Sequence, residues 1–104
     1  MPRQYRVILT NDALADIAEI AAYIRADSPD NSALVCERIL KVFDGLESMP
    51  GRFKARGGSR SRRTPVHVAM EKPFLIYYTI VRKSGTVFVL RVRHGARRQP
   101  RRFP

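Results

Sequence analysis

The sequence is poor in the residues that build several common kinds of functional site. It has one cysteine, Cys36, which excludes an internal disulfide and gives no cysteine-based metal cluster. Cys36 falls in an apolar helical stripe, which favours a small core residue over a nucleophile. No apolar run reaches the roughly 18 residues that span a bilayer, and the N-terminus lacks the apolar core of a signal peptide. We therefore expect a cytoplasmic protein with no membrane partner, no metal and no cofactor.

Acidic residues are nearly absent from the second half of the chain. Residues 51–104 contain fifteen Lys and Arg residues and one acid, Glu71, whereas residues 1–50 contain five basic residues and eight acids. The net charge of +11 is therefore concentrated in the C-terminal half. Sixteen of the twenty basic residues are arginine, whose planar guanidinium suits phosphate and carboxylate groups. This pattern favours nucleic acid or an acidic protein as the partner, without choosing between them.

The first half of the chain predicts one strand and two helices. Residues 4–9 alternate as a short strand. Thr10-Asn11-Asp12 supplies a helix N-cap, and apolar residues then recur at three- and four-residue spacing. The acids of this helix, among them Asp16, are expected to form a solvated face. Ser28-Pro29 caps and begins a second helix, which extends to about residue 48 and is ended by Pro50-Gly51.

The second half predicts a basic loop and three strands. Residues 51–64 lack the phosphate-cradling Gly-x4-Gly-Lys-Ser/Thr pattern, and their charge density favours a phosphate or partner contact over a merely solubilising connection. Residues 66–70 alternate, and residues 74–81 are almost continuously apolar, as expected for a central strand covered on both faces. The closing strand, centred on residues 87–92, breaks at Gly95 into a tail that has arginines and no acids.

These elements predict an α+β fold of a single domain, because 104 residues provide one core. The order is β-α-α-β-β-β. It implies a small, mostly antiparallel sheet of four strands packed on an N-terminal helical hairpin. The other face of the sheet is expected to be thinly covered and available to a partner segment.

The ordered set of motifs resembles the RelE/ParE superfamily of type II toxin–antitoxin toxins. The residues that carry the resemblance are Tyr5-Arg6-Val7, Ala13, Asp16-Ile17, Tyr23-Ile24, Ser28-Pro29, Leu46, Pro50, Phe74-Leu75-Ile76-Tyr77-Tyr78 and the ending Val89 to Arg97 with His94-Gly95-Ala96-Arg97. The resemblance covers nearly the whole chain and is closer to the ParE branch. It implies one toxin domain, 1–104, with an Arg-rich C-terminal tail (about 94–104), often found in plasmid stabilisation modules and neutralised by a cognate antitoxin.

The superfamily implies two alternative activities. RelE-like members are ribosome-dependent mRNA endonucleases, whereas ParE-like members inhibit DNA gyrase. RNA cleavage through the 2′-hydroxyl needs a proton acceptor and groups that stabilise the phosphate. If the chain is RelE-like, the candidates for these catalytic roles are Arg62, Arg63, Arg91, His94 and Arg97. The late tyrosine common in the nuclease class is missing, since Phe103 is the only aromatic residue after Phe88.

The C-terminal sequence, with its missing late tyrosine, therefore favours a gyrase inhibitor. A nuclease that acts on ribosome-bound mRNA is the alternative. The candidate target-binding residues are Arg91, Arg93, His94, Arg97, Arg98, Arg101 and Arg102. We expect Arg91, Arg97 and Arg98 to be exposed, so that alanine there lowers toxicity with little loss of folding.

Overall fold

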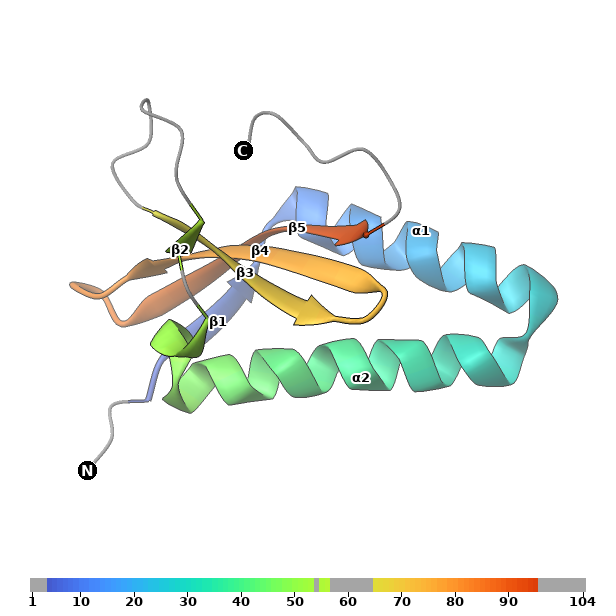
Figure 1. The fold of residues 1–104 in the computed structure, drawn as a ribbon, viewed down its shortest axis with the longest axis horizontal. Helices are drawn as coiled ribbons and strands as arrows, with labels where there is room; N and C mark the ends of the chain where they lie inside the picture. The colour runs from blue at the N-terminus through green and yellow to red at the C-terminus, as the bar shows by residue number, and fades with distance from the viewer. Residues whose placement is uncertain (1–3, 54, 57–64, 96–104) are drawn as a thin grey trace.

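The computed structural model describes residues 4–53, 55–56 and 65–95, in which a mixed sheet lies on a pair of antiparallel helices (Figure 1). The elements in chain order are β1 (Arg6–Leu9), α1 (Asn11–Asp27), α2 (Pro29–Ser48), the 3-10 turn η1 (Pro50–Arg52), β2 (Ala55–Arg56), β3 (Val66–Glu71), β4 (Phe74–Val81) and β5 (Thr86–His94). The predicted α+β fold with a helical hairpin on the sheet is confirmed.

The helix boundaries follow from local capping chemistry. The Thr10 side chain accepts a hydrogen bond from the Ala13 N–H and so caps α1. Ser28 does the same for α2 through the Asn31 N–H, and Pro29 occupies the first helical turn, where its missing N–H costs nothing. Both predicted helices therefore begin where their cap residues stand.

The sheet has the strand order β1-β5-β4-β3-β2, one strand more than predicted. The β3–β4 and β4–β5 pairs are antiparallel, whereas β1 runs parallel to β5. The additional strand, β2, is two residues long and pairs with β3 from within the basic loop. It was missed because so short a pairing leaves no alternating pattern in the sequence.

One extra residue interrupts the pairing of β5 with β4. Tyr78 lies opposite Val89 and Tyr77 lies opposite Arg91, so Leu90 has no opposing residue. Val87 and Val89 before this bulge pack in the helix-side core, and so does Val92 after it, whereas Leu90 packs on the other face. The bulge therefore reverses which residues of β5 point toward the helices.

The core is divided between the two faces of the sheet. The helix-side cluster joins Ile39 and Leu46 of α2 to Ile76 and Tyr78 of β4. On the opposite face Val66, Tyr77 and Leu90 form a second buried cluster, and Tyr77 is fully buried. The expectation of a thinly covered second face is therefore wrong at the centre of that face, although β4 is covered on both sides as predicted.

Tyr78 ties the segment after α2 to the sheet. Its hydroxyl donates a hydrogen bond of 2.6 Å to the Pro50 carbonyl, and its ring stacks on His67 with 5.1 Å between the centroids. His67 Nδ1 in turn lies 2.7 Å from the Phe53 carbonyl oxygen. Burial raises the pKa of Tyr78 to about 12, so the hydroxyl stays protonated over the physiological range. His67 therefore takes part in the packing of this region.

Among the described residues, neither helix combines the length and apolar character needed to cross a bilayer.

Candidate functional site

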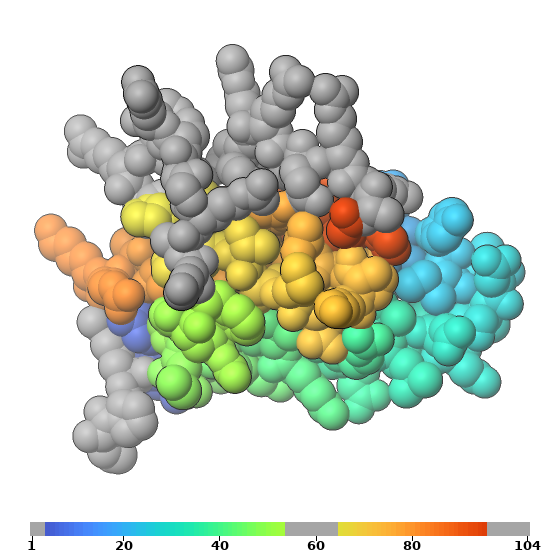
Figure 2. All heavy atoms as spheres, in the orientation of Figure 1, coloured from blue at the N-terminus to red at the C-terminus, as the bar shows by residue number. Residues whose placement is uncertain are grey.

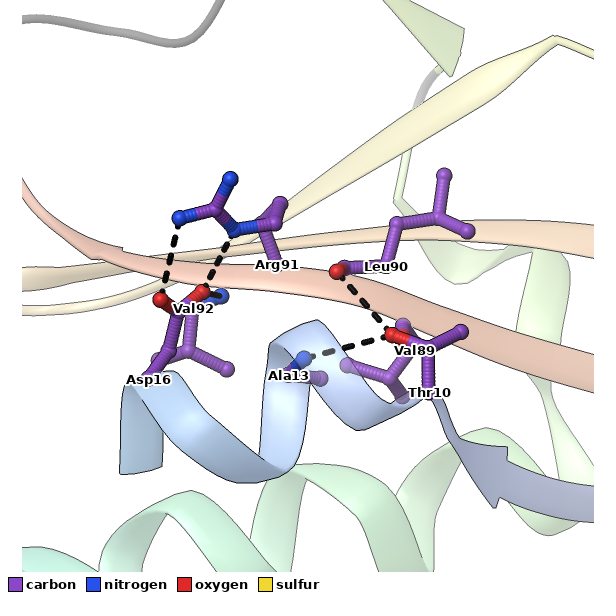
Figure 3. Close-up of polar contacts among 7 residues, drawn as sticks. All are labelled: Thr10, Ala13, Asp16, Val89, Leu90, Arg91 and Val92. Carbon is purple, nitrogen blue, oxygen red and sulfur yellow. Dashed lines mark hydrogen bonds and ion pairs between the residues drawn. The ribbon is translucent and has the colours of Figure 1, made fainter. Parts of the chain in front are cut away.

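Asp16 forms the most extensive polar contact between α1 and β5 (Figure 3). Its carboxylate accepts hydrogen bonds from Arg91 Nε at 2.7 Å and from the second Arg91 nitrogen at 3.0 Å. A third hydrogen bond, of 2.9 Å, comes from the backbone N–H of Val92. Both partners are mostly shielded, with 10% of the Asp16 and 23% of the Arg91 side chain exposed. Such a bidentate, charge-assisted pair fixes both distance and orientation.

The position of Asp16 follows from the short length of β1. Because β1 pairs with β5 only as far as Val89, the edge of β5 beyond that residue lacks a neighbouring strand. Thr10 closes the junction, with its hydroxyl 2.9 Å from the Val89 carbonyl oxygen and 3.1 Å from that of Leu90. The first turns of α1 then cover the edge, and Asp16 accepts the otherwise unpaired Val92 N–H.

Two sequence-based expectations are wrong at this contact. Asp16 does not belong to a solvated face, since it is one of the two buried residues of α1. Arg91 is not a freely exposed charge, because hydrogen bonding to Asp16 engages its guanidinium and raises the pKa of Arg91. Replacing Arg91 by alanine would leave the Asp16 carboxylate shielded and without its cation, so the expected small effect on folding does not hold for this residue.

A groove of about 560 Å³ lies between the two helices and the end of the sheet that carries the C-terminus of β5. Its apolar lining is Ile20, Tyr23, Ile24, Val35, Pro73, Phe74 and Val92, and its polar lining is Asp16, Glu19, Asn31, Arg38, Arg93 and His94. Tyr23 is 71% exposed, which is far more than a core residue of an amphipathic helix should be. The groove thus combines an apolar floor with charged groups of both signs.

The turn between β3 and β4 closes one end of this groove. Arg38 of α2 holds the turn by donating hydrogen bonds to the Glu71 carboxylate, at 3.0 Å, and to the Lys72 carbonyl. The Gly95 N–H donates to the Pro73 carbonyl at 2.6 Å. Figure 2 shows the end of β5 (red) emerging between this turn (golden) and α1 (blue). The wall of the groove and the last described residue of the chain are therefore parts of one contact network.

Three of the predicted site residues lie in the described part of the chain. Arg91 lies opposite Tyr77 of the second cluster, whereas His94 lies opposite Phe74 of the helix-side core and packs edge-on against its ring at 5.6 Å between centroids. Arg93 lines the groove together with His94. The remaining candidates, Arg62, Arg63, Arg97, Arg98, Arg101 and Arg102, lie outside the described residues, so their roles stay predictions.

Sequence reasoning did not identify which residues of α1 and α2 contribute to this region. Tyr23 and Arg38 read as ordinary helix residues, and only the pairing of the helices with the end of the sheet brings them to one groove. The available signal in the sequence was Tyr23 itself, a large aromatic residue that flanks the apolar stripe of the first helix. No three His, Cys, Asp or Glu residues in the described ranges are placed to hold a metal ion.

Comparison with known proteins identifies the family. A model of the ParE toxin of the type II toxin–antitoxin system parDE matches residues 7–99. The protein named Putative toxin Y4kP of Sinorhizobium fredii is 36% identical over 95 residues, which cover 91% of this chain and 93% of the relative. Toxin RelE2 of Caulobacter vibrioides is 30% identical over 92 residues, covering 88% and 97%.

Solved structures share the fold at lower identity. The toxin–antitoxin complex RelBE2 of Mycobacterium tuberculosis contains a chain with a TM-score of 0.62 and 24% identity, covering 91% of this chain and 95% of that one. A chain of the chromosomal ParDE system of P. aeruginosa gives a TM-score of 0.66 at 16% identity, covering 88% and 96%. Fold, motifs and sequence matches agree, and the chain belongs to the ParE toxin family, within the ParE/RelE superfamily of type II toxin–antitoxin toxins.

Proposed function

We propose that this toxin inhibits DNA gyrase rather than cleaving ribosome-bound mRNA. The observation that carries the proposal is the separation of the two described nuclease candidates. Arg91 and His94 lie opposite residues of different faces of β4, and each is already engaged, by the Asp16 carboxylate and by the Phe74 ring. A 2′-hydroxyl and its phosphate need their acid–base and cationic groups within hydrogen-bonding reach of one site. Arg91 and His94 do not meet this requirement, because they do not face one common site.

A DNA supercoiling assay with purified toxin tests the proposal directly. We expect the toxin to block supercoiling by gyrase and to leave mRNA on translating ribosomes intact. Expression without an antitoxin should also cause DNA-damage signalling and filamentation. Uninhibited supercoiling combined with cutting of ribosome-bound mRNA would overturn the gyrase assignment in favour of the nuclease.

The Arg-rich C-terminal tail is the proposed contact with the target. Changing Arg97 and Arg98 together to alanine should raise the concentration for half-inhibition of supercoiling at least ~10-fold, because two cations that pair with phosphate or carboxylate groups are lost. The melting temperature should stay within about 2 °C of wild type, as for surface substitutions in general.

The matched control is the pair Arg82 and Lys83, also changed to alanine. Both are exposed in the turn between β4 and β5, so the control removes the same charge from a different place. Equal loss of inhibition by the two double variants would mean that only net charge matters, and the tail would lose its assigned role.

We further propose that a cognate antitoxin segment binds the groove between the helices and the end of β5. The similar folds described above were solved as toxin–antitoxin complexes, which supports a partner of this kind. The apolar lining of the groove suits the anchoring side chains of an amphipathic segment, and Arg38 and Arg93, which also line it, suit acidic ones. Part of the affinity should therefore fall with rising salt.

A further inference from the structure

Asp16 borders the proposed antitoxin groove, but it is the one acid of α1 whose side chain is buried, and its carboxylate is bound by β5. Placing a carboxylate out of water is unfavourable unless hydrogen bonds and an opposite charge compensate. Arg91 and the Val92 N–H supply this compensation. The same hydrogen bonds fix Arg91 and Val92 of β5 to α1, although Arg91 is 75 positions from Asp16 in the sequence.

The fixed residues lie just before the end of the described structure. From Val92 the strand continues for two residues to His94, whose ring packs on Phe74, and then to Gly95. The Gly95 N–H donates to the Pro73 carbonyl. A Cβ at Gly95 would approach the Pro73 oxygen to 3.0 Å, so the close contact favours glycine there. The end of β5 is thus held from the α1 side by Asp16 and from the turn side by Pro73.

We propose that Asp16 is a positioning residue: through Arg91 and Val92 it fixes the C-terminal end of β5, which immediately precedes the Arg-rich tail in the sequence. This proposal rests on the proposed function, in which the tail makes the target contact. In this arrangement Arg91 binds Asp16 and does not contact the target, which distinguishes it from Arg97 and Arg98.

Amide hydrogen exchange tests the positioning role without reference to any target. The test variant is Asp16→Asn, which keeps the side-chain volume and an oxygen acceptor but removes the charge. The matched control is Asp12→Asn, one turn earlier on α1, where the acid is exposed. Exchange at Gly95 is divided by exchange at Val87, a fully buried residue of β5, so that a loss of global stability, which speeds exchange at Val87 at least as much, cannot by itself raise the ratio.

We expect this ratio to rise at least tenfold in Asp16→Asn and to stay at the wild-type value in Asp12→Asn. The Gly95 N–H bonds to Pro73 and not to Asp16, so a purely local structural role of Asp16 would not move it. An unchanged ratio in Asp16→Asn overturns the proposal.

Toxicity in cells without antitoxin gives a second and independent readout, at matched levels of folded protein. We expect Asp16→Asn and Arg91→Ala each to reduce toxicity about tenfold. The double variant should be as toxic as the less toxic of the two single variants, because both changes remove the same contact. If Arg91 instead contacts the target, Asp16→Asn frees its charge and toxicity is kept or increased, whereas Arg91→Ala loses it. That outcome also overturns the proposal.

These readouts separate failure of this inference from failure of the gyrase assignment. A wild-type toxin that leaves supercoiling untouched refutes the target, while the exchange ratio and the toxicity comparison still report on Asp16. If Asp16→Asn is unfolded at the growth temperature, Arg91→Lys serves in its place. It keeps the charge but loses the two-pronged geometry, and it should give the same direction of change in the Gly95 ratio and in toxicity. Wild-type values of both for Arg91→Lys count against the proposal.

Discussion

Replacing Tyr23 by alanine is expected to weaken antitoxin binding about 30-fold or more while leaving the toxin folded and toxic. Tyr23 lines the groove and is 71% exposed, so its large ring contributes little to the core but is available to a partner. Exposed tyrosines that become buried in an interface are among the residues whose truncation costs about 2 kcal/mol or more. That loss corresponds to the expected change in the dissociation constant.

The measurement is the affinity of the purified toxin for its cognate antitoxin, with growth of cells that express both proteins as the functional readout. Leu40→Ala is the matched control, because Leu40 is 54% exposed on α2 and does not line the groove. We expect cells to be rescued by the antitoxin from the Leu40 variant but not from the Tyr23 variant. Equal affinities of the two variants would place the antitoxin elsewhere on the surface.

The largest expected effect on stability is at Tyr78. Tyr78→Ala removes a fully buried ring and should lower the free energy of unfolding by about 3–5 kcal/mol. Tyr78→Phe keeps the ring but leaves the Pro50 carbonyl without its donor, at a cost of about 1–3 kcal/mol. For a domain of this size each kcal/mol lowers the melting temperature by about 4–8 °C. Thermal unfolding of the two variants therefore separates ring packing from the hydrogen bond.

Tyr78 should also make the free energy of unfolding fall at alkaline pH. Because burial raises the pKa of Tyr78 to about 12 from its ordinary 10.0, the folded state favours the protonated phenol. The resulting stabilisation is fully present below about pH 10 and is lost as the pH rises toward 12. The stability difference between wild type and Tyr78→Phe should therefore be constant near neutral pH and shrink above pH 10. Tyr23→Phe, which changes an exposed hydroxyl, is the control and should leave the free energy of unfolding at neutral pH close to the wild-type value.

The parts of this fold that could be predicted from sequence are those that depend on neighbouring residues. Thr10 and Ser28-Pro29 determine the starts of both helices through hydrogen bonds that span three residues. The apolar run of residues 74–81 likewise identifies the central strand, because a strand covered on both faces has no polar alternation.

The site depends on contacts that no local pattern encodes. Asp16 has the same spacing as the exposed acids of α1, and its burial results from the unpaired edge of β5, which exists because β1 stops opposite Val89. The groove joins residues of α1, α2, β4 and β5 and has no counterpart in any one segment. The Arg-rich tail was identified by composition alone, which gives its charge, and its residues after Gly95 lie outside the described part of the chain.

The extra residue at Leu90 changes which positions of β5 face the helices, from odd-numbered residues before it to even-numbered residues after it. Odd-numbered valines, Val87 and Val89, enter the helix-side core before it, and the even-numbered Val92 enters it afterwards. Deletion of Leu90 would restore strict alternation along β5, with Arg91 directly after Val89, Val92 still facing the helices and Arg93 still facing away. This short stretch should consequently accept the loss of its extra residue more readily than a polar substitution at Val89 or Val92, both of which are buried in the helix-side core.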